Sequence, residues 1–172
     1  MVLLNDAKAH GLPGERYMTD EEFMDEAVRI AVRNVSEGGG PFGAVIVKDG
    51  KIVARGVNRV TANLDPTAHA EVQAIRSACR ALGSFSLEGG ILYTSCEPCP
   101  MCLSAVYWAR IDRIFYACTR DDAERAGFSD RLIYDELRKD ISERSVREIR
   151  IEDYRFLDPF RAWEAKADRT DY

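Results

Sequence analysis

The sequence lacks a long apolar run. No stretch of about 18 consecutive apolar residues occurs in its 172 residues, so we expect no membrane-spanning helix. The apolar part near the N-terminus, Val2 to Leu4, is too short for a signal peptide, and this absence predicts a cytoplasmic protein. Internal repeats and low-complexity linkers are also missing, which at this length favours a single domain.

Excess positive charge is missing as well. Lys and Arg number 24 against 29 Asp and Glu, a formal net charge of −5. Phosphate contacts need clustered Lys and Arg, so this balance argues against a dedicated binder of nucleic acids or polyphosphates. A small neutral substrate is compatible with it.

Capping signals and hydrophobic periodicity predict an α/β protein. Residues 1–18 are interpreted as a loose lead-in, and residues 19–172 as one domain. Thr19 and Glu22 form a capping box for a first helix, and Asp49-Gly50 joins two β-rich runs into a hairpin. Helices are predicted from Thr19 to before Gly38 and at 68–82, 100–109, 130–139 and 159–167. Strands are predicted at 42–47, 51–57, 91–95, 113–117 and 146–151. Together these predict a three-layer α/β/α fold with a mixed sheet of about five strands.

Histidine is scarce, and one of the two histidines belongs to a metal-binding pattern. His69 and the cysteines Cys99 and Cys102 supply one imidazole and two thiolates, which suit zinc. Three protein ligands leave a fourth position open, as in a catalytic site. The two cysteines are three residues apart at the predicted start of a helix, whose N-terminus favours thiolates. Cys96 also forms a Cys-x-x-Cys pair with Cys99 and stays open as an alternative ligand.

Glu71 follows the histidine by two residues. We interpret it as an acid/base group that takes a proton from the attacking water and passes it to a ring nitrogen. It then protonates the departing amino group. His-x-Glu followed by Pro-Cys-x-x-Cys is the signature of zinc deaminases. A non-catalytic zinc module is the alternative from another class, but it has no need of a carboxylate beside an open metal position.

The sequence resembles the cytidine deaminase-like superfamily, and within it the bacterial guanine deaminases. The resemblance implies hydrolysis of guanine to xanthine and ammonia, with one zinc ion per chain held by His69, Cys99 and Cys102. Glu71 is then the proton shuttle. The stretches that carry this resemblance are 40–47, 65–71, 93–102, 105–109, 126–130, 159–163 and Tyr172.

The same resemblance implies how the base is held. Asn58 hydrogen-bonds the base, and Asp130 is a second carboxylate that contacts it and assists the leaving amine. Tyr172 closes over the site from a partner subunit through a swapped tail, which implies a homodimer. The remaining residues implied to contact the base are Phe42, Ala70 and Trp108.

These residues also have plain structural interpretations. Asn58 can be a turn residue, Phe42 and Trp108 can belong to the core, Asp130 can cap a helix, and Tyr172 can be a frayed end. Relatives often carry two acidic residues where this chain has Ser129 before a single Asp, so a shift of one position would remove the second carboxylate.

Other deaminases of the same fold stay open as alternatives. They are a tRNA adenosine deaminase, a guanosine or cytosine deaminase, and a triazine- or pterin-processing relative, which share the zinc motif. An enzyme that edits RNA needs basic and aromatic groups for phosphates and splayed bases. The net acidic chain favours a small-molecule substrate.

Overall fold

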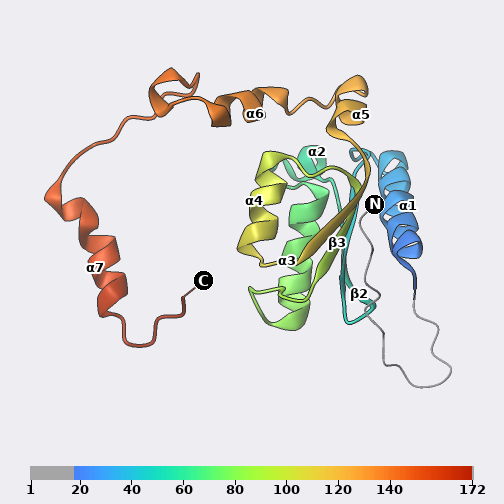
Figure 1. Ribbon diagram of the computed structural model, residues 1–172, viewed down its shortest axis with the longest axis horizontal. Coiled ribbons are helices and arrows are strands. Elements are labelled where there is room, and N and C mark those ends of the chain that lie inside the picture. The colour runs from blue at the N-terminus through green and yellow to red at the C-terminus, as the bar shows by residue number, and fades with distance from the viewer. Residues whose placement is uncertain (1–17, 172) are drawn as a thin grey trace, which may run out of the picture.

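A four-stranded mixed sheet forms the centre of the fold (Figure 1). The computed structural model describes residues 18–171, and the predicted lead-in lies outside them apart from Met18. The strand order is β2-β1-β3-β4, with β1 antiparallel to β2 and β3, and β3 parallel to β4. The strands are β1 (Gly43–Lys48), β2 (Lys51–Val57), β3 (Ile91–Cys96) and β4 (Arg113–Cys118).

Helices cover both faces of this sheet. The α-helices are α1 (Asp20–Ser36), α2 (Val60–Asn63), α3 (Ala70–Leu82), α4 (Pro100–Trp108), α5 (Arg120–Arg125), α6 (Arg131–Arg138) and α7 (Asp158–Ala165). Two short 3-10 helices are η1 (Ile141–Glu143) and η2 (Tyr154–Leu157). Because side chains alternate along a strand, Val45 and Val47 of β1 pack under α1, while Ala44 and Ile46 pack under α3 and α4. The predicted three-layer α/β/α fold is confirmed.

Local signals set the element boundaries. Thr19 and Glu22 form the predicted capping box of α1, with both reciprocal hydrogen bonds present. Asp49 and Gly50 both have positive φ, at 51° and 71°, as the tight hairpin between β1 and β2 requires. Both predictions are confirmed. The short helices α2 and α5 were not predicted.

Gly56 brings β2 directly against the first turn of α3. A Cβ atom at this position would collide with the carbonyl oxygen of Ala70 and the backbone nitrogen of Ala74. Only glycine allows the two backbones to approach so closely. This contact fixes where α3 begins, and therefore where His69 and Glu71 lie relative to the sheet.

The predicted strand at 146–151 is wrong for this structure. In Figure 1 the chain beyond α6 leaves the sheet as an extended arc that ends in α7. Val146, Ile149 and Ile151 are 76 %, 77 % and 75 % exposed. A strand needs an edge to pair with, and no described strand lies beside this segment, so the sheet has four strands rather than about five.

Among residues 18–171, no helix combines the length and the apolar character that crossing a membrane demands.

Candidate metal centre and pocket

His69, Cys99 and Cys102 come together at one end of the sheet. Their ligand atoms all lie within 4.8 Å of one another. The Sγ atoms of Cys99 and Cys102 lie 3.6 and 3.5 Å from Nδ1 of His69. One imidazole nitrogen and two thiolate sulfurs at this spacing fit a zinc ion and leave a coordination position for another ligand. The predicted ligand set is therefore assembled.

Two helix N-termini create this cluster. His69 is the N-cap residue of α3, and Cys99 is the N-cap residue of α4, with Pro100 at the first helical position. Cys102 lies one turn further on the same helix and is fully buried. The neighbouring Cys102 and His69 side chains lower the pKa of the Cys99 thiol. The cysteine spacing thus places two sulfurs at a helix end that favours negative charge.

Cys96 points elsewhere. It ends β3, and its thiol donates to the carbonyl oxygen of Thr119 at 3.6 Å. Burial raises the pKa of this thiol to about 12. Among the described residues, the cluster of possible ligand atoms contains Cys99 and Cys102 but not Cys96, so the Cys99–Cys102 pair is the one that fits the metal.

Glu71 lies beside the cluster and is only 6 % exposed. The Cys102 thiol donates to its Oε2 at 3.4 Å, and the Thr94 hydroxyl donates to its Oε1 at 3.2 Å. Burial raises the pKa of this carboxyl above its usual range. A carboxyl that is oriented from two sides and whose affinity for protons is increased is suited to accept and return protons.

A cavity of about 670 Å³ opens beside these groups. Phe42 lines one wall, and its ring meets that of Phe128 edge to face, with centroids 5.0 Å apart and an interplanar angle of 87°. Asn58 also lines the cavity, and its Oδ1 accepts the N–H of Val60 at 3.3 Å. Further lining residues are Gly38, Gly39, Gly40, His69, Glu71, Glu97, Cys99, Arg120, Asp130 and Ile133.

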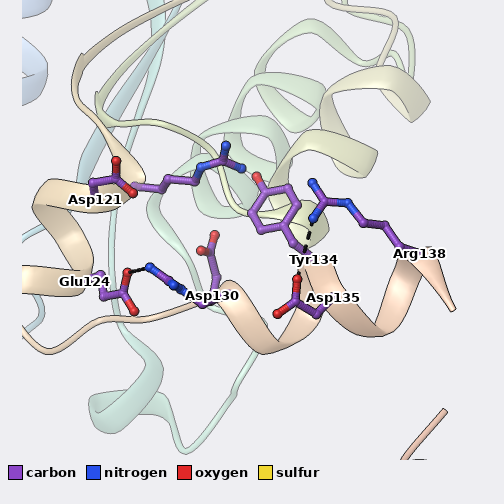
Figure 2. Close-up of a pocket in the computed structure, with 8 residues that line it drawn as sticks. Asp121, Glu124, Asp130, Tyr134, Asp135 and Arg138 are labelled. Carbon is purple, nitrogen blue, oxygen red and sulfur yellow. Dashed lines mark hydrogen bonds and ion pairs between the residues drawn. The ribbon is translucent and has the colours of Figure 1, made fainter.

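Asp130 belongs to this cavity and also to a second, polar pocket of about 280 Å³ between α5 and α6. Figure 2 shows its carboxylate rising from the start of α6 toward Tyr134. It holds the N-cap position, but its side chain makes no capping hydrogen bond in the described structure. Burial raises the pKa of this carboxyl. The guanidinium of Arg120 lies 4.9 Å from the centroid of the Tyr134 ring.

Two predicted site residues lie apart from the cavity walls, and a third is not among the described residues. Ala70 is fully buried, with its carbonyl oxygen against Gly56. Trp108 ends α4 and lines a separate groove together with Phe85 and Thr170. Tyr172 lies outside the described residues. The cluster and cavity thus bring together seven of the ten predicted residues: Phe42, Asn58, His69, Glu71, Cys99, Cys102 and Asp130.

The sequence reasoning missed Phe128, Arg120 and Glu97 as cavity residues. Phe128 lies within the stretch 126–130 that carried part of the resemblance, and this was the available signal. Arg120 and Glu97 are joined by a hydrogen bond from the Arg120 backbone N–H to the Glu97 carboxylate, at 3.1 Å. This contact depends on the parallel pairing of β3 with β4, which no local pattern displays.

Comparisons with known proteins agree with this site. Residues 18–118 match the family described as the cytidine and deoxycytidylate deaminase zinc-binding region. Guanine deaminase of Bacillus subtilis (strain 168) is 53 % identical over 156 residues, which cover 90 % of this chain and 100 % of that protein. Its X-ray structure superimposes with a TM-score of 0.88 at 52 % identity, over 90 % of this chain and 99 % of the other.

More distant relatives include enzymes of two kinds. The structure of a guanine deaminase from Nitrosomonas europaea matches with a TM-score of 0.64 at 32 % identity, over 76 % of this chain and 80 % of the other. A tRNA-specific adenosine deaminase of Aquifex aeolicus (strain VF5) is 44 % identical over 100 residues, which cover 58 % of this chain and 66 % of that protein.

The cluster predicts which cysteine holds zinc. We expect Cys99→Ser to weaken zinc binding by more than about 100-fold, since losing only an outer partner of a ligand costs about 10–100-fold. Cys96→Ser is the matched control and should keep the zinc content of the wild type. Metal analysis after dialysis against a graded chelator measures both. Zinc retained in Cys99→Ser but lost in Cys96→Ser would contradict the assignment.

Proposed function

Since this chain belongs to the cytidine and deoxycytidylate deaminase zinc-binding family, we propose that it hydrolyses guanine to xanthine and ammonia. The observation that carries the proposal is the pairing of a three-ligand metal cluster with a buried carboxyl at the wall of one cavity. The full-length similarity to a guanine deaminase supports guanine as the base. The shorter similarity to tRNA-specific adenosine deaminases leaves RNA editing as the weaker candidate.

His69, Cys99 and Cys102 would hold a zinc ion, which would supply the Lewis acid that activates water for attack. Glu71 performs the proton transfers of the reaction. It accepts a proton from the attacking water and passes it to the ring nitrogen. It then takes the remaining proton of the added hydroxyl group and delivers it to the departing amino group, so that the carbonyl of the product forms as ammonia leaves. The hydroxyl of Thr94 donates to this carboxylate and holds it in one orientation for these transfers.

The purine is held by stacking and by a few polar contacts. Phe42 and Phe128 supply a rigid aromatic corner for the ring, and Asn58 supplies an amide that hydrogen-bonds the base. Asp130, at the start of α6, contacts the base and assists protonation of the leaving amine. Water and guanine are consumed together, and xanthine and ammonia leave.

A homodimer with exchanged tails completes the proposed enzyme. The edge of β4 carries no pairing strand within the described chain, while Val146, Ile149 and Ile151 stay exposed on the extended arc. We propose that the segment 146–151 of one copy pairs with β4 of another, as exposed strand edges readily accept an added strand. The predicted fifth strand would then form between subunits.

The same exchange would restore two predicted site residues. Trp108 on the outer surface of α4 is 68 % exposed, and a second copy packed there would carry it toward the partner's cavity. The tail would bring Tyr172 over that cavity. Its volume of about 670 Å³ suits a drug-sized ligand, and a nucleobase is smaller, so the cavity has room for an added side chain beside the base.

We propose the cytoplasm as the location. Cys99 and Cys102 bind metal only as reduced thiolates, and all five cysteines are free. A reducing compartment preserves this state.

Ammonia release from a panel of substrates tests the proposed reaction. The zinc-loaded protein is incubated with guanine, adenine, cytosine, guanosine and a tRNA anticodon stem-loop. We expect guanine to give the highest kcat/KM, and Glu71→Gln to reduce its turnover by about 10³-fold or more with zinc content unchanged. The exposed Glu88 provides the control Glu88→Gln, which should match the wild type. Faster release from the stem-loop than from guanine would overturn the proposal.

Replacing Asp130 tests its proposed contact with the base. Asp130→Asn should lower kcat/KM for guanine by about 10–100-fold, the scale of one hydrogen bond to a charged group. Zinc content should stay at the wild-type level. Asp49→Asn, at a turn whose positive φ asparagine tolerates, is the control. Equal kinetics for the two variants would remove Asp130 from the site.

Light scattering after gel filtration tests the dimer. The wild type should elute as a dimer, and the double variant Ile149→Asp/Ile151→Asp should shift to monomer, because charges would enter the proposed strand pairing. Val32→Asp, on the exposed face of α1, is the control for adding a charge and should stay dimeric. A monomeric wild type, or a double variant that remains a dimer, would contradict tail exchange.

A further inference from the structure

Asn34, in the last turn of α1, lies beneath the wall of the cavity. It is 1 % exposed. Its Nδ2 donates two hydrogen bonds of 2.8 Å, one to the carbonyl oxygen of Gly40 and one to that of Asn58. One buried amide therefore joins α1 to the glycine loop at 38–40 and to the segment that follows β2, both of which line the cavity.

The contacts of Asn34 extend to a third part of the wall. The carbonyl oxygen of Gly40 also accepts the N–H of Phe42 at 2.8 Å, and the carbonyl oxygen of Phe42 accepts the N–H of Asn58 at 3.1 Å. Gly40, Phe42 and Asn58 thus form a chain of backbone hydrogen bonds whose two end residues bind the same side chain. Movement of Asn34 would displace all three.

Position 39 has no room for a side chain, because the Asn34 amide lies directly against it. A Cβ atom there would lie 2.6 Å from both Cγ and Oδ1 of Asn34. The N–H of Gly39 also donates to the backbone carbonyl oxygen of Asn34 at 2.8 Å. The loop therefore closes directly over the amide, so the position of the loop depends on this side chain.

The hydrogen bonding of Asn34 is one-sided. Both bonds use Nδ2, while Oδ1 is buried with no hydrogen-bond partner in the described structure. A buried acceptor without a partner costs stability. The amide is thus better suited to fixing two carbonyl groups in place than to stabilising the fold.

We propose that Asn34 is a positioning residue for base recognition, acting through Asn58 and the glycine loop. The proposal rests on the proposed function, in which Asn58 binds the base. Asn34 touches neither the metal cluster nor Glu71 among its hydrogen bonds in residues 18–171. Its loss should therefore weaken binding of the base and leave the chemical step intact.

A double-mutant cycle with Asn58 tests the proposal. In Asn34→Asp the volume is kept, but a carboxylate faces two carbonyl oxygens and repels them. We expect KM for guanine to rise about 10–100-fold, the cost of a displaced binding group, with kcat within about threefold and zinc unchanged. In an Asn58→Ala background the same substitution should raise KM by a clearly smaller factor than in the wild type, because one of the groups that Asn34 positions is gone.

Asn63→Asp, an exposed asparagine of α2, is the matched control and should leave KM unchanged. Gly39→Ala perturbs the same contact from the loop side and serves if Asn34→Asp does not fold; it should also raise KM more in the wild type than in the Asn58→Ala background. Equal effects on KM with and without Asn58, or a loss confined to kcat, would overturn the proposal.

Hydrogen exchange separates this proposal from the proposed function. In Asn34→Asp without substrate, amides at 38–42 and at Asn58 should exchange faster than in Asn63→Asp, because the anchor of these segments is lost. Unchanged exchange would overturn the role of Asn34 whatever the substrate. Faster exchange in a protein that releases no ammonia from guanine would support the anchor and reject the reaction.

Discussion

The site depends on two helices that begin at the same end of one sheet. Gly56 lets β2 touch the backbone of α3, which fixes His69 at the start of that helix. The parallel step from β3 into α4 places Cys99 at a second start. Neither helix holds a metal site alone. Because both N-termini are anchored to the core, three ligand atoms from two distant segments meet without a dedicated loop.

The local part of this arrangement was predictable from sequence. The capping box at Thr19, the hairpin at Asp49-Gly50 and the cysteine pair flanking Pro100 are patterns within a few residues, and each one determines its own geometry. Spacing alone left Cys96 open as a ligand, because Cys96 and Cys99 are also three residues apart. The structure separates the pairs, since Cys96 ends β3 while Cys99 and Cys102 lie at the start of α4.

The remainder depends on contacts between distant segments. In the sequence, Asn34 is one polar residue among others in a predicted helix. Only the folded chain shows that its side chain hydrogen-bonds the carbonyl oxygens of Gly40 and Asn58. Phe128 becomes a cavity wall only once it meets Phe42. The strand predicted at 146–151 is wrong for this structure, because a local pattern does not show whether a sheet edge lies within reach of the segment.

The exposed arc beyond α6 has a geometric consequence. A molecule that carries both an open strand edge and a segment fitting such an edge can share them with its neighbours in two ways. A reciprocal exchange about a twofold axis pairs both β4 edges and ends at two copies, whereas exchange in one direction leaves a β4 edge free at each addition and grows into a filament. The reach and stiffness of residues 139–145 between α6 and the arc would decide which outcome is favoured. In the proposed exchange, this short connection would therefore favour either a discrete dimer or a polymer.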